Sequence, residues 1–332
     1  MKGDYVTSRL RPVSTRQDRS APRVKRLLLL LCPLVLCASG LSAQRSVFEG
    51  VKIYRHRSAD DRALVDKFGT LTFDDSARKV TFSDGSGDRI EVGYDDVGKV
   101  VLEITTRMRG GTFAQVAKVV GAEGMIVGTA LARPHVDDHW FYMEFKDQGR
   151  SESALLEIPK NCSAPAIEKA NQVFGSRVSV PDFPQKSAEI QTADLKAYHS
   201  EQTLKIDKQN HPLPEVKPDK ATIVVVCPAL IGHFQGKKNR FRLHANDQVI
   251  AVNELGTYSF AYLDPGKYRL VSQTENANGF EMELAAGQEY YFVQNAFHGN
   301  FKPKTSLSRN SQELVSYLVQ GSYFSDWKAK EK

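Results

Sequence analysis

The sequence of 332 residues contains only four cysteines. Cys32 and Cys37 lie in an apolar N-terminal run, so the rest of the chain contains only Cys162 and Cys227. The spacing of these two matches no metal-binding or redox motif. We therefore expect two separate buried thiols, and a disulfide is the alternative that an oxidising compartment would permit.

A charge excess is also missing once the N-terminus is set aside. The formal net charge is +6, but eight of the 45 basic residues and two of the 39 acidic residues lie within residues 1–43. The remainder holds equal numbers of each sign. Because binding to nucleic acid through its phosphates requires a basic surplus, no nucleic-acid partner is expected.

The apolar run near the N-terminus is shorter than the roughly 20 residues that a membrane-spanning helix needs. It begins at Leu27 after Lys25-Arg26, is interrupted by Pro33 and ends in small residues at Ala43. This order is typical of a secretory signal peptide, predicted here at residues 1–43. We expect cleavage after Ala43 and a periplasmic or extracellular product, and an uncleaved anchor is the alternative.

Residues 44–181 contain short period-two segments separated by polar turns. Strands are predicted over 69–73, 79–82, 89–94, 99–105, 139–145 and 153–158. The period then becomes helical: Ser163 can cap a helix, Ile167, Ala170 and Phe174 share one face, and Gly175 ends it.

This order of strands and one amphipathic helix resembles the pleckstrin-homology-like superfold, particularly its bacterial members. The resemblance implies a curled antiparallel sheet that the helix plugs with Ile167, Ala170 and Phe174. Some eukaryotic members bind phosphoinositides through basic residues in the loop between the first two strands. The corresponding loop here, residues 74–78, is acidic, so no headgroup site is transferred.

Residues 110–133 interrupt this domain with small and apolar residues. Gly121, Gly124 and Gly128 have a spacing that allows close approach to another helix or to a bilayer surface, whereas Lys118 opposes a true span. We expect an insertion packed on the domain, and weak membrane contact through 110–133 is the alternative.

Residues 182–220 are rich in proline, lysine, glutamine and aspartate. This composition predicts a polar linker, with at most a short helix around residues 188–204. Because such a segment buries little apolar surface, the halves on either side are expected to fold independently.

Residues 221–327 form the second predicted domain, a β-sandwich. The β-branched run at 221–227 suits a central strand, and a closing amphipathic helix is predicted at 311–320. Further strands are predicted at 239–245, 248–255, 257–263, 267–273, 280–284 and 289–295.

The stretch from Thr257 to Leu270 is the strongest signal in this domain. Asp264-Pro265-Gly266 predicts a tight hairpin turn in which Gly266 has a positive φ. Four aromatic residues of the flanking strands are expected in the core. These are Tyr258, Phe260, Tyr262 and Tyr268.

The order of Tyr258-Ser259-Phe260, the turn to Tyr268 and the segment 286–291 resembles a widespread uncharacterised domain family of exported bacterial proteins. That family is similar to the regulatory sandwich of carboxypeptidases and to repeat sandwiches of surface proteins. The resemblance transfers no catalytic residue. The whole chain is thus expected to be mainly β (α+β), an antiparallel pleckstrin-homology-like barrel with a C-terminal helix followed by an antiparallel β-sandwich with a closing helix.

One pair of histidines has the chemistry of metal ligands. His135 and His139 are four residues apart, with Asp137 and Asp138 between them. Pro134 opposes the helix that would bring the two imidazoles together. A solvated loop is therefore expected instead of a zinc site.

Two further groups of residues contain possible metal ligands. The segment from Asp84 to Asp88 is similar to the start of a calcium loop, but Arg89 stands where glycine is required and Asp95 replaces the closing glutamate. The histidines of the second domain could converge only through its fold, and scattered surface positions are expected instead. They are His233, His244 and His298.

Recognisable catalytic motifs are also missing, including a nucleophile elbow and a phosphate-binding loop. We expect no catalytic residue, metal or cofactor. The sequence predicts an exported, non-enzymatic protein that binds an unknown protein or envelope component. The alternatives are a cell-wall-directed hydrolase with an unrecognised active site and a peripheral membrane-associated protein.

Overall fold

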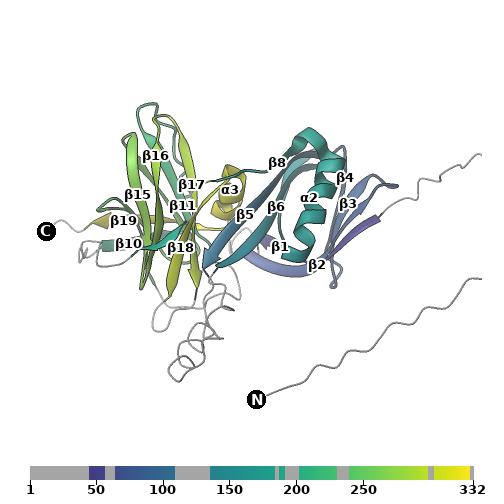
Figure 1. Cartoon of the computed structure of the whole chain (residues 1–332), viewed down its shortest axis with the longest axis horizontal. Coiled ribbons are helices and arrows are strands. Elements are labelled where there is room, and N and C mark those ends of the chain that lie inside the picture. Colours follow the sequence, from purple (N-terminus) through teal and green to yellow (C-terminus); the bar gives the residue numbers. More distant parts are fainter. Residues whose placement is uncertain are drawn as a thin grey trace, which may run out of the picture. The chain divides into compact units, whose positions relative to one another are not determined.

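The computed structural model describes residues 45–56, 64–108, 135–183, 187–190, 202–229, 239–297 and 303–329. The predicted signal peptide, the insertion at 110–133, His233 and His298 lie outside these residues. The described residues belong to one unit that extends from Ala43 to Lys332. As predicted, they form a mainly β structure (Figure 1).

The first lobe is an eight-stranded sheet with the order β4-β3-β2-β1-β7-β6-β5-β8, in which only β5 and β8 are parallel neighbours. Its strands are β1 (Arg45–His56), β2 (Leu64–Asp74), β3 (Lys79–Asp84), β4 (Arg89–Gly93), β5 (Val97–Met108), β6 (His135–Asp147), β7 (Arg150–Ile158) and β8 (Val178–Ser179). Strand β1 pairs with both β2 and β7 and so joins the two halves of the sheet. The sequence did not predict it, because a bulge at Gly50, with a φ of 71°, interrupts its alternation.

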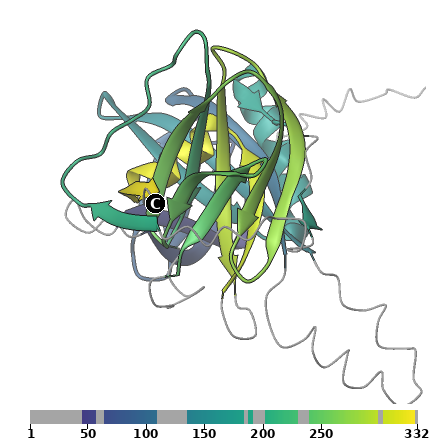
Figure 2. The same cartoon turned by 90° about the vertical axis from the view of Figure 1, so that its left-hand side faces the viewer.

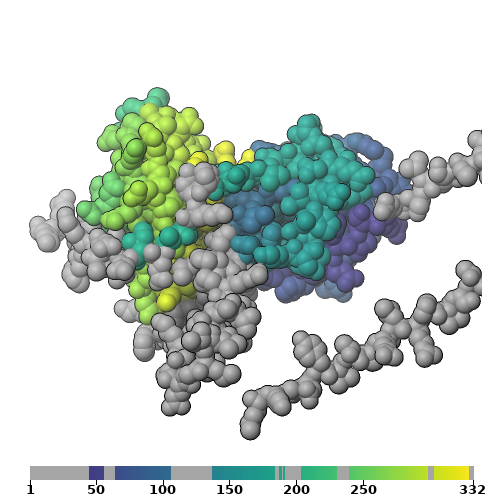
Figure 3. All heavy atoms as spheres, in the orientation of Figure 1, coloured from purple at the N-terminus to yellow at the C-terminus, as the bar shows by residue number. Residues whose placement is uncertain are grey.

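Helix α2 (Lys160–Phe174) packs against this sheet and forms part of the surface in Figure 3. Ala170 and Phe174 are buried in the core and Ile167 packs against it, as predicted. The helix begins after Pro159 instead of at Ser163, whose hydroxyl donates to the carbonyl of Lys160.

The second lobe consists of a six-stranded sheet, β10-β19-β14-β11-β17-β18, and a five-stranded sheet, β13-β12-β15-β16-β9 (Figure 2). Its strands are β9 (Ala188–Ile190), β10 (Gln202–Asp207), β11 (Ala221–Cys227), β12 (Phe241–Ala245), β13 (Gln248–Asn253), β14 (Thr257–Leu263), β15 (Gly266–Gln273), β16 (Ala277–Leu284), β17 (Glu289–Phe297), β18 (Lys304–Asn310) and β19 (Tyr323–Ala329). The first of these sheets is mixed, since β11 is parallel to β17 and β14 to β19. The prediction of an antiparallel sandwich is wrong on this point.

The turn at Asp264-Pro265 does not form the predicted hairpin. β14 pairs with β11, whereas β15 pairs with β12 and β16, so the turn carries the chain from one sheet to the other. Gly266 does have a positive φ, of 152°. A local pattern specifies the reversal of the chain, but the partners of each strand are decided by distant segments.

The aromatic residues of β14 consequently face away from the core between the two sheets. Ala261 and Leu263 pack against that core, while Tyr258 and Phe260 belong to a different cluster on the outer face. Of the predicted aromatic core residues, only Tyr268 packs against the core between the sheets.

Part of the predicted linker is built into the sandwich. Strand β9 pairs with β16, and β10 forms six residue pairs with β19. Ala188–Ile190 is therefore a strand, where the sequence suggested a short helix. The composition gave no signal for these strands because each one contributes backbone hydrogen bonds to an existing sheet edge and little apolar surface.

Helix α3 (Gln312–Gln320) packs on the outer face of the six-stranded sheet, as predicted, and also contacts the first lobe (Figure 1). A single buried cluster includes side chains of both lobes. Its members are Tyr54, Leu64, Val101, Trp140, Tyr142 and Leu155 with Val224, Val226, Tyr258, Val293, Leu314, Val315, Tyr317, Leu318 and Val319. This shared core opposes the expectation that the two halves fold independently.

Candidate functional site

The outer face of β14 carries an aromatic stripe, which we call the tyrosine face. It consists of Tyr258, Phe260 and Tyr262 together with Phe324 of β19. Successive ring centroids are close: 5.5 Å for Tyr258 and Phe324, 5.6 Å for Phe324 and Phe260, and 6.0 Å for Phe260 and Tyr262. The alternation of β14 explains the stripe, since every second side chain points to the same side.

Residues 208–220, here called the strap, connect β10 to β11 and run beside this face (Figure 2, the long loop at the left). They contain no strand. Pro212, Pro214 and Pro218 fix their own φ angles and bias the preceding residues to extended conformations. The prolines therefore favour an extended course for residues 211–217, between a bend at 208–209 and the turn in which the amide of Lys220 donates to the carbonyl of Lys217.

Two tyrosine hydroxyls bind the backbone of the strap. The hydroxyl of Tyr258 donates to the carbonyl of Pro212 at 2.8 Å, and the amide of Glu215 donates to the hydroxyl of Tyr262 at 3.1 Å. The hydroxyl of Tyr258 thus acts as a donor and that of Tyr262 as an acceptor. The two strap residues that they bind, Pro212 and Glu215, are three positions apart.

Ring contacts complete this arrangement. The imidazole of His211 lies 4.8 Å from the ring of Tyr258, and the ammonium of Lys217 lies 3.9 Å from the ring centre of Tyr262. A cation at this distance over an aromatic face is attracted by the quadrupole of the ring. The tyrosine face therefore holds a backbone segment and one positive charge of the same chain.

The apolar side chains of the strap point away from the tyrosine face. Leu213 is 66% exposed and Val216 51% exposed, whereas Tyr258 beneath the strap is fully buried. From the sequence, the aromatic alternation predicts a core strand and the proline-rich segment predicts a linker. Nothing in either pattern specifies that the two meet.

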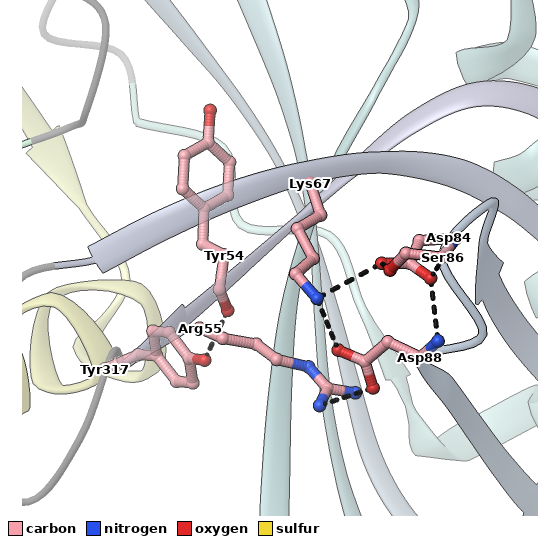
Figure 4. A network of polar contacts seen from close by, with 7 residues as sticks. All are labelled: Tyr54, Arg55, Lys67, Asp84, Ser86, Asp88 and Tyr317. Atoms are coloured by element: carbon pink, nitrogen blue, oxygen red, sulfur yellow. Dashed lines mark hydrogen bonds and ion pairs between the residues drawn. The ribbon is translucent and has the colours of Figure 1, made fainter.

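The calcium-like loop at Asp84 is closed by the protein's own groups (Figure 4). The carboxylate of Asp84 accepts from the amides of Ser86 and Asp88 and from the hydroxyl of Ser86, and the ammonium of Lys67 lies 3.2 Å from it. Arg55 pairs with Asp88 at 3.0 Å. These contacts use the oxygens that a cation would need, and they lower the pKa of Asp84 to about 2.

The lowered pKa predicts how this loop responds to acid. A carboxylate whose folded-state pKa is depressed contributes stabilisation above its ordinary pKa of 3.8, and this is lost as the pH falls toward 2. The amides of Ser86 and Asp88 should lose hydrogen-exchange protection through that window. In Asp84→Asn, the protection of these two amides, followed by NMR, should not change with pH between 3.8 and about 2. The same pH dependence in both proteins would contradict the role given to the Asp84 carboxylate.

The prediction of a solvated loop around the histidine pair is wrong, because the segment belongs to β6 and both Asp138 and His139 are buried. His139 is buried on β6 and neither ring nitrogen has a hydrogen-bond partner, and burial lowers the pKa of the imidazole. Asp137 lies 3.1 Å from the ammonium of Lys160. The side chain of His135 lies outside the described residues, among which no group of three or more metal-ligating side chains occurs.

The prediction of scattered surface histidines is wrong for His244, the one of the three that lies among the described residues. His244 is buried in β12 and its Nε2 lies 2.9 Å from the amide oxygen of Gln273. Cys162 and Cys227 are both free, as expected, but only Cys227 is fully buried and Cys162 is partly exposed. Burial raises the pKa of the Cys227 thiol.

A small cavity lies where α3 meets the two lobes, lined by Trp140, Asn310 and Leu318 among others. Its volume is about 10 Å³. That is room for about one water molecule. We therefore assign the candidate site to the tyrosine face and not to this cavity.

Comparison with known proteins gives no relative from which a function could be transferred: neither a family model nor a curated protein matches the sequence. Among the described residues, none of the helices has the length and apolar character that crossing a membrane requires.

Proposed function

We propose that the chain is an exported, non-catalytic binding protein that acts at the cell envelope, in the periplasm or outside the cell. The observation that carries this proposal is the tyrosine face, which holds an extended segment through hydroxyl-to-backbone hydrogen bonds and a cation over a ring. Such contacts are typical of peptide recognition and require no reacting group.

The architecture supports a binding role for the first lobe as well. We propose that it belongs to the pleckstrin-homology-like superfold; in support, seven antiparallel strands are followed by α2, which packs against the core of the sheet. The second lobe is proposed to be an adaptor sandwich similar to the regulatory domains of carboxypeptidases. Both kinds of domain serve mainly as recognition modules.

The proposal is tested in cells with a photo-crosslinking amino acid in place of Leu213, which is exposed beside the tyrosine face. The matched control carries it in place of Glu281, an exposed residue of β16 in the other sheet. We expect a defined covalent adduct from position 213 and none from position 281. The intact mass of the recovered protein should show cleavage near Ala43.

Two results would contradict the proposal. A full-length product confined to the cytoplasm would remove the envelope role. Equal adducts from the two positions, or none from either, would remove the tyrosine face as the binding surface.

A further inference from the structure

We propose that the tyrosine face binds an extended, proline-containing peptide with a basic side chain in a partner protein, and that the strap is its competitor within the same chain. This inference rests on the proposed binding function and names the class of ligand. In the structure, the strap occupies the site as such a peptide would.

The contacts of the strap define a register for the ligand. A proline carbonyl, that of Pro212, accepts from Tyr258. Three residues later an amide, that of Glu215, donates to Tyr262, so this position cannot be proline. Two residues further, the ammonium of Lys217 covers the ring of Tyr262.

This register favours a proline-containing ligand for an energetic reason. Prolines preset the extended conformation, so that less chain entropy is lost when the two backbone hydrogen bonds form. A positive side chain is required at the last position, because an anion over the ring face would be repelled by its negative quadrupole.

Several features make the middle of the strap displaceable. β10 is held by a six-residue ladder to β19, whereas residues 211–217 have no strand and are bound through side chains of the tyrosine face. The two ends of the strap are anchored separately, by Lys208 over the ring of Tyr323 and by Lys220, whose ammonium pairs with Asp264 and whose carbonyl accepts from the amide of Gly287. Leu213 and Val216 are exposed and add little burial. The tyrosine face itself lies on β14 and β19, two strands inside the six-stranded sheet, so it persists when the strap leaves.

Displacement of the strap would expose apolar rings of the tyrosine face to water. Phe260 and Phe324 supply rings between the two tyrosines. A large exposed apolar patch is unfavourable in water and is typical of a surface that meets a partner. A partner peptide of the same register covers the face in place of the strap.

The test uses a fluorescein-labelled peptide with the sequence of residues 208–220 and the mature full-length chain, with binding measured by fluorescence anisotropy. A strap that occupies the site most of the time in cis lowers the apparent affinity by the fraction left open, for example about tenfold at one-tenth open. We therefore expect weak binding to wild type. Binding about tenfold tighter is expected for a chain with Pro212→Ala and Pro214→Ala.

Two substitutions separate recognition from release of the strap. Tyr262→Phe, added to the strap-weakened chain, keeps the ring but removes the acceptor for the amide, and peptide affinity should fall several-fold. Lys217→Glu in the labelled peptide should also weaken binding. Lys217 is exposed, so the same Lys217→Glu change in the chain should leave the fold intact. It should weaken the strap as a competitor and therefore tighten binding of the unchanged peptide.

Several outcomes would overturn the inference. Binding no tighter in either weakened chain, each folded by circular dichroism, would show that the strap is not a competitor. Equal binding of a scrambled peptide without prolines would remove the ligand class. If the weakened chains formed dimers in the absence of peptide, the ligand of the tyrosine face would be a second copy of the chain and not a partner peptide. If position 213 still gives a cellular adduct, the binding function stands and only the ligand class fails.

Discussion

Tyr317→Ala is expected to lower the free energy of unfolding of both lobes together, by about 3–5 kcal/mol. Tyr317 is 5% exposed on α3. Its hydroxyl donates to the backbone carbonyl of Tyr54 in β1 at 2.6 Å, and its ring packs edge-on against Tyr142 of β6 with centroids 6.3 Å apart. Its removal leaves a cavity and a buried carbonyl without a donor.

Urea denaturation followed by far-UV circular dichroism measures this effect. The control is Tyr317→Phe, which keeps the ring contact with Tyr142 and loses only the hydrogen bond, at a cost of about 1 kcal/mol. If Tyr317→Ala proved no worse than this control, the contact between α3 and the first lobe would not contribute as the structure indicates.

Glu103→Ala is expected to lower the free energy of unfolding by about 2–4 kcal/mol, because three hydrogen-bond donors lose the acceptor that they share. The carboxylate of Glu103, on β5, is 3% exposed and accepts from the side-chain amide of Asn310, the backbone amide of Ser311 and the hydroxyl of Ser311. Ser311 caps α3 through its own hydroxyl. The first lobe thus orders the start of a helix that belongs to the second.

The pH dependence of Glu103→Gln distinguishes this role from simple packing. Burial raises the pKa of Glu103 above its ordinary value of 4.5, and nearby Glu313, which pairs with Lys99, acts in the same direction. A raised carboxylate pKa favours the folded state at low pH, and this advantage is lost as the pH rises through the folded-state pKa. The unfolding free energy of wild type minus that of Glu103→Gln should therefore decrease from acidic to neutral pH. A constant difference would contradict a buried, titrating carboxylate.

Local patterns predicted much of the second lobe. The strand Thr257–Leu263 and the helix after Ser311 agree with the prediction to within a residue, because alternation and capping are properties of neighbouring residues. Leu314 and Leu318 lie on the apolar side of that helix. Tyr317 lies on another side of the helix, and only the packing of α3 against the first lobe shows that this side is buried as well.

The candidate site could be predicted only in its separate parts. The alternation of Tyr258, Phe260 and Tyr262 indicates one buried face, but it does not specify whether the cover is the opposite sheet or a segment some 50 residues earlier in the chain. Glu103 is a polar residue in a strand and gives no signal by itself. Its role arises from the approach of Ser311, far along the chain.

The central claim is that residues 43–332 act as one unit joined by α3, with the tyrosine face held on a rigid support. Native-state hydrogen exchange with increasing urea, followed by mass spectrometry, tests it most directly. The account predicts that amides of β5 and β6 in the first lobe and of β11 and β14 in the second lose protection with the same free energy and the same urea dependence. Loss of protection in one lobe while the other stays protected would contradict it.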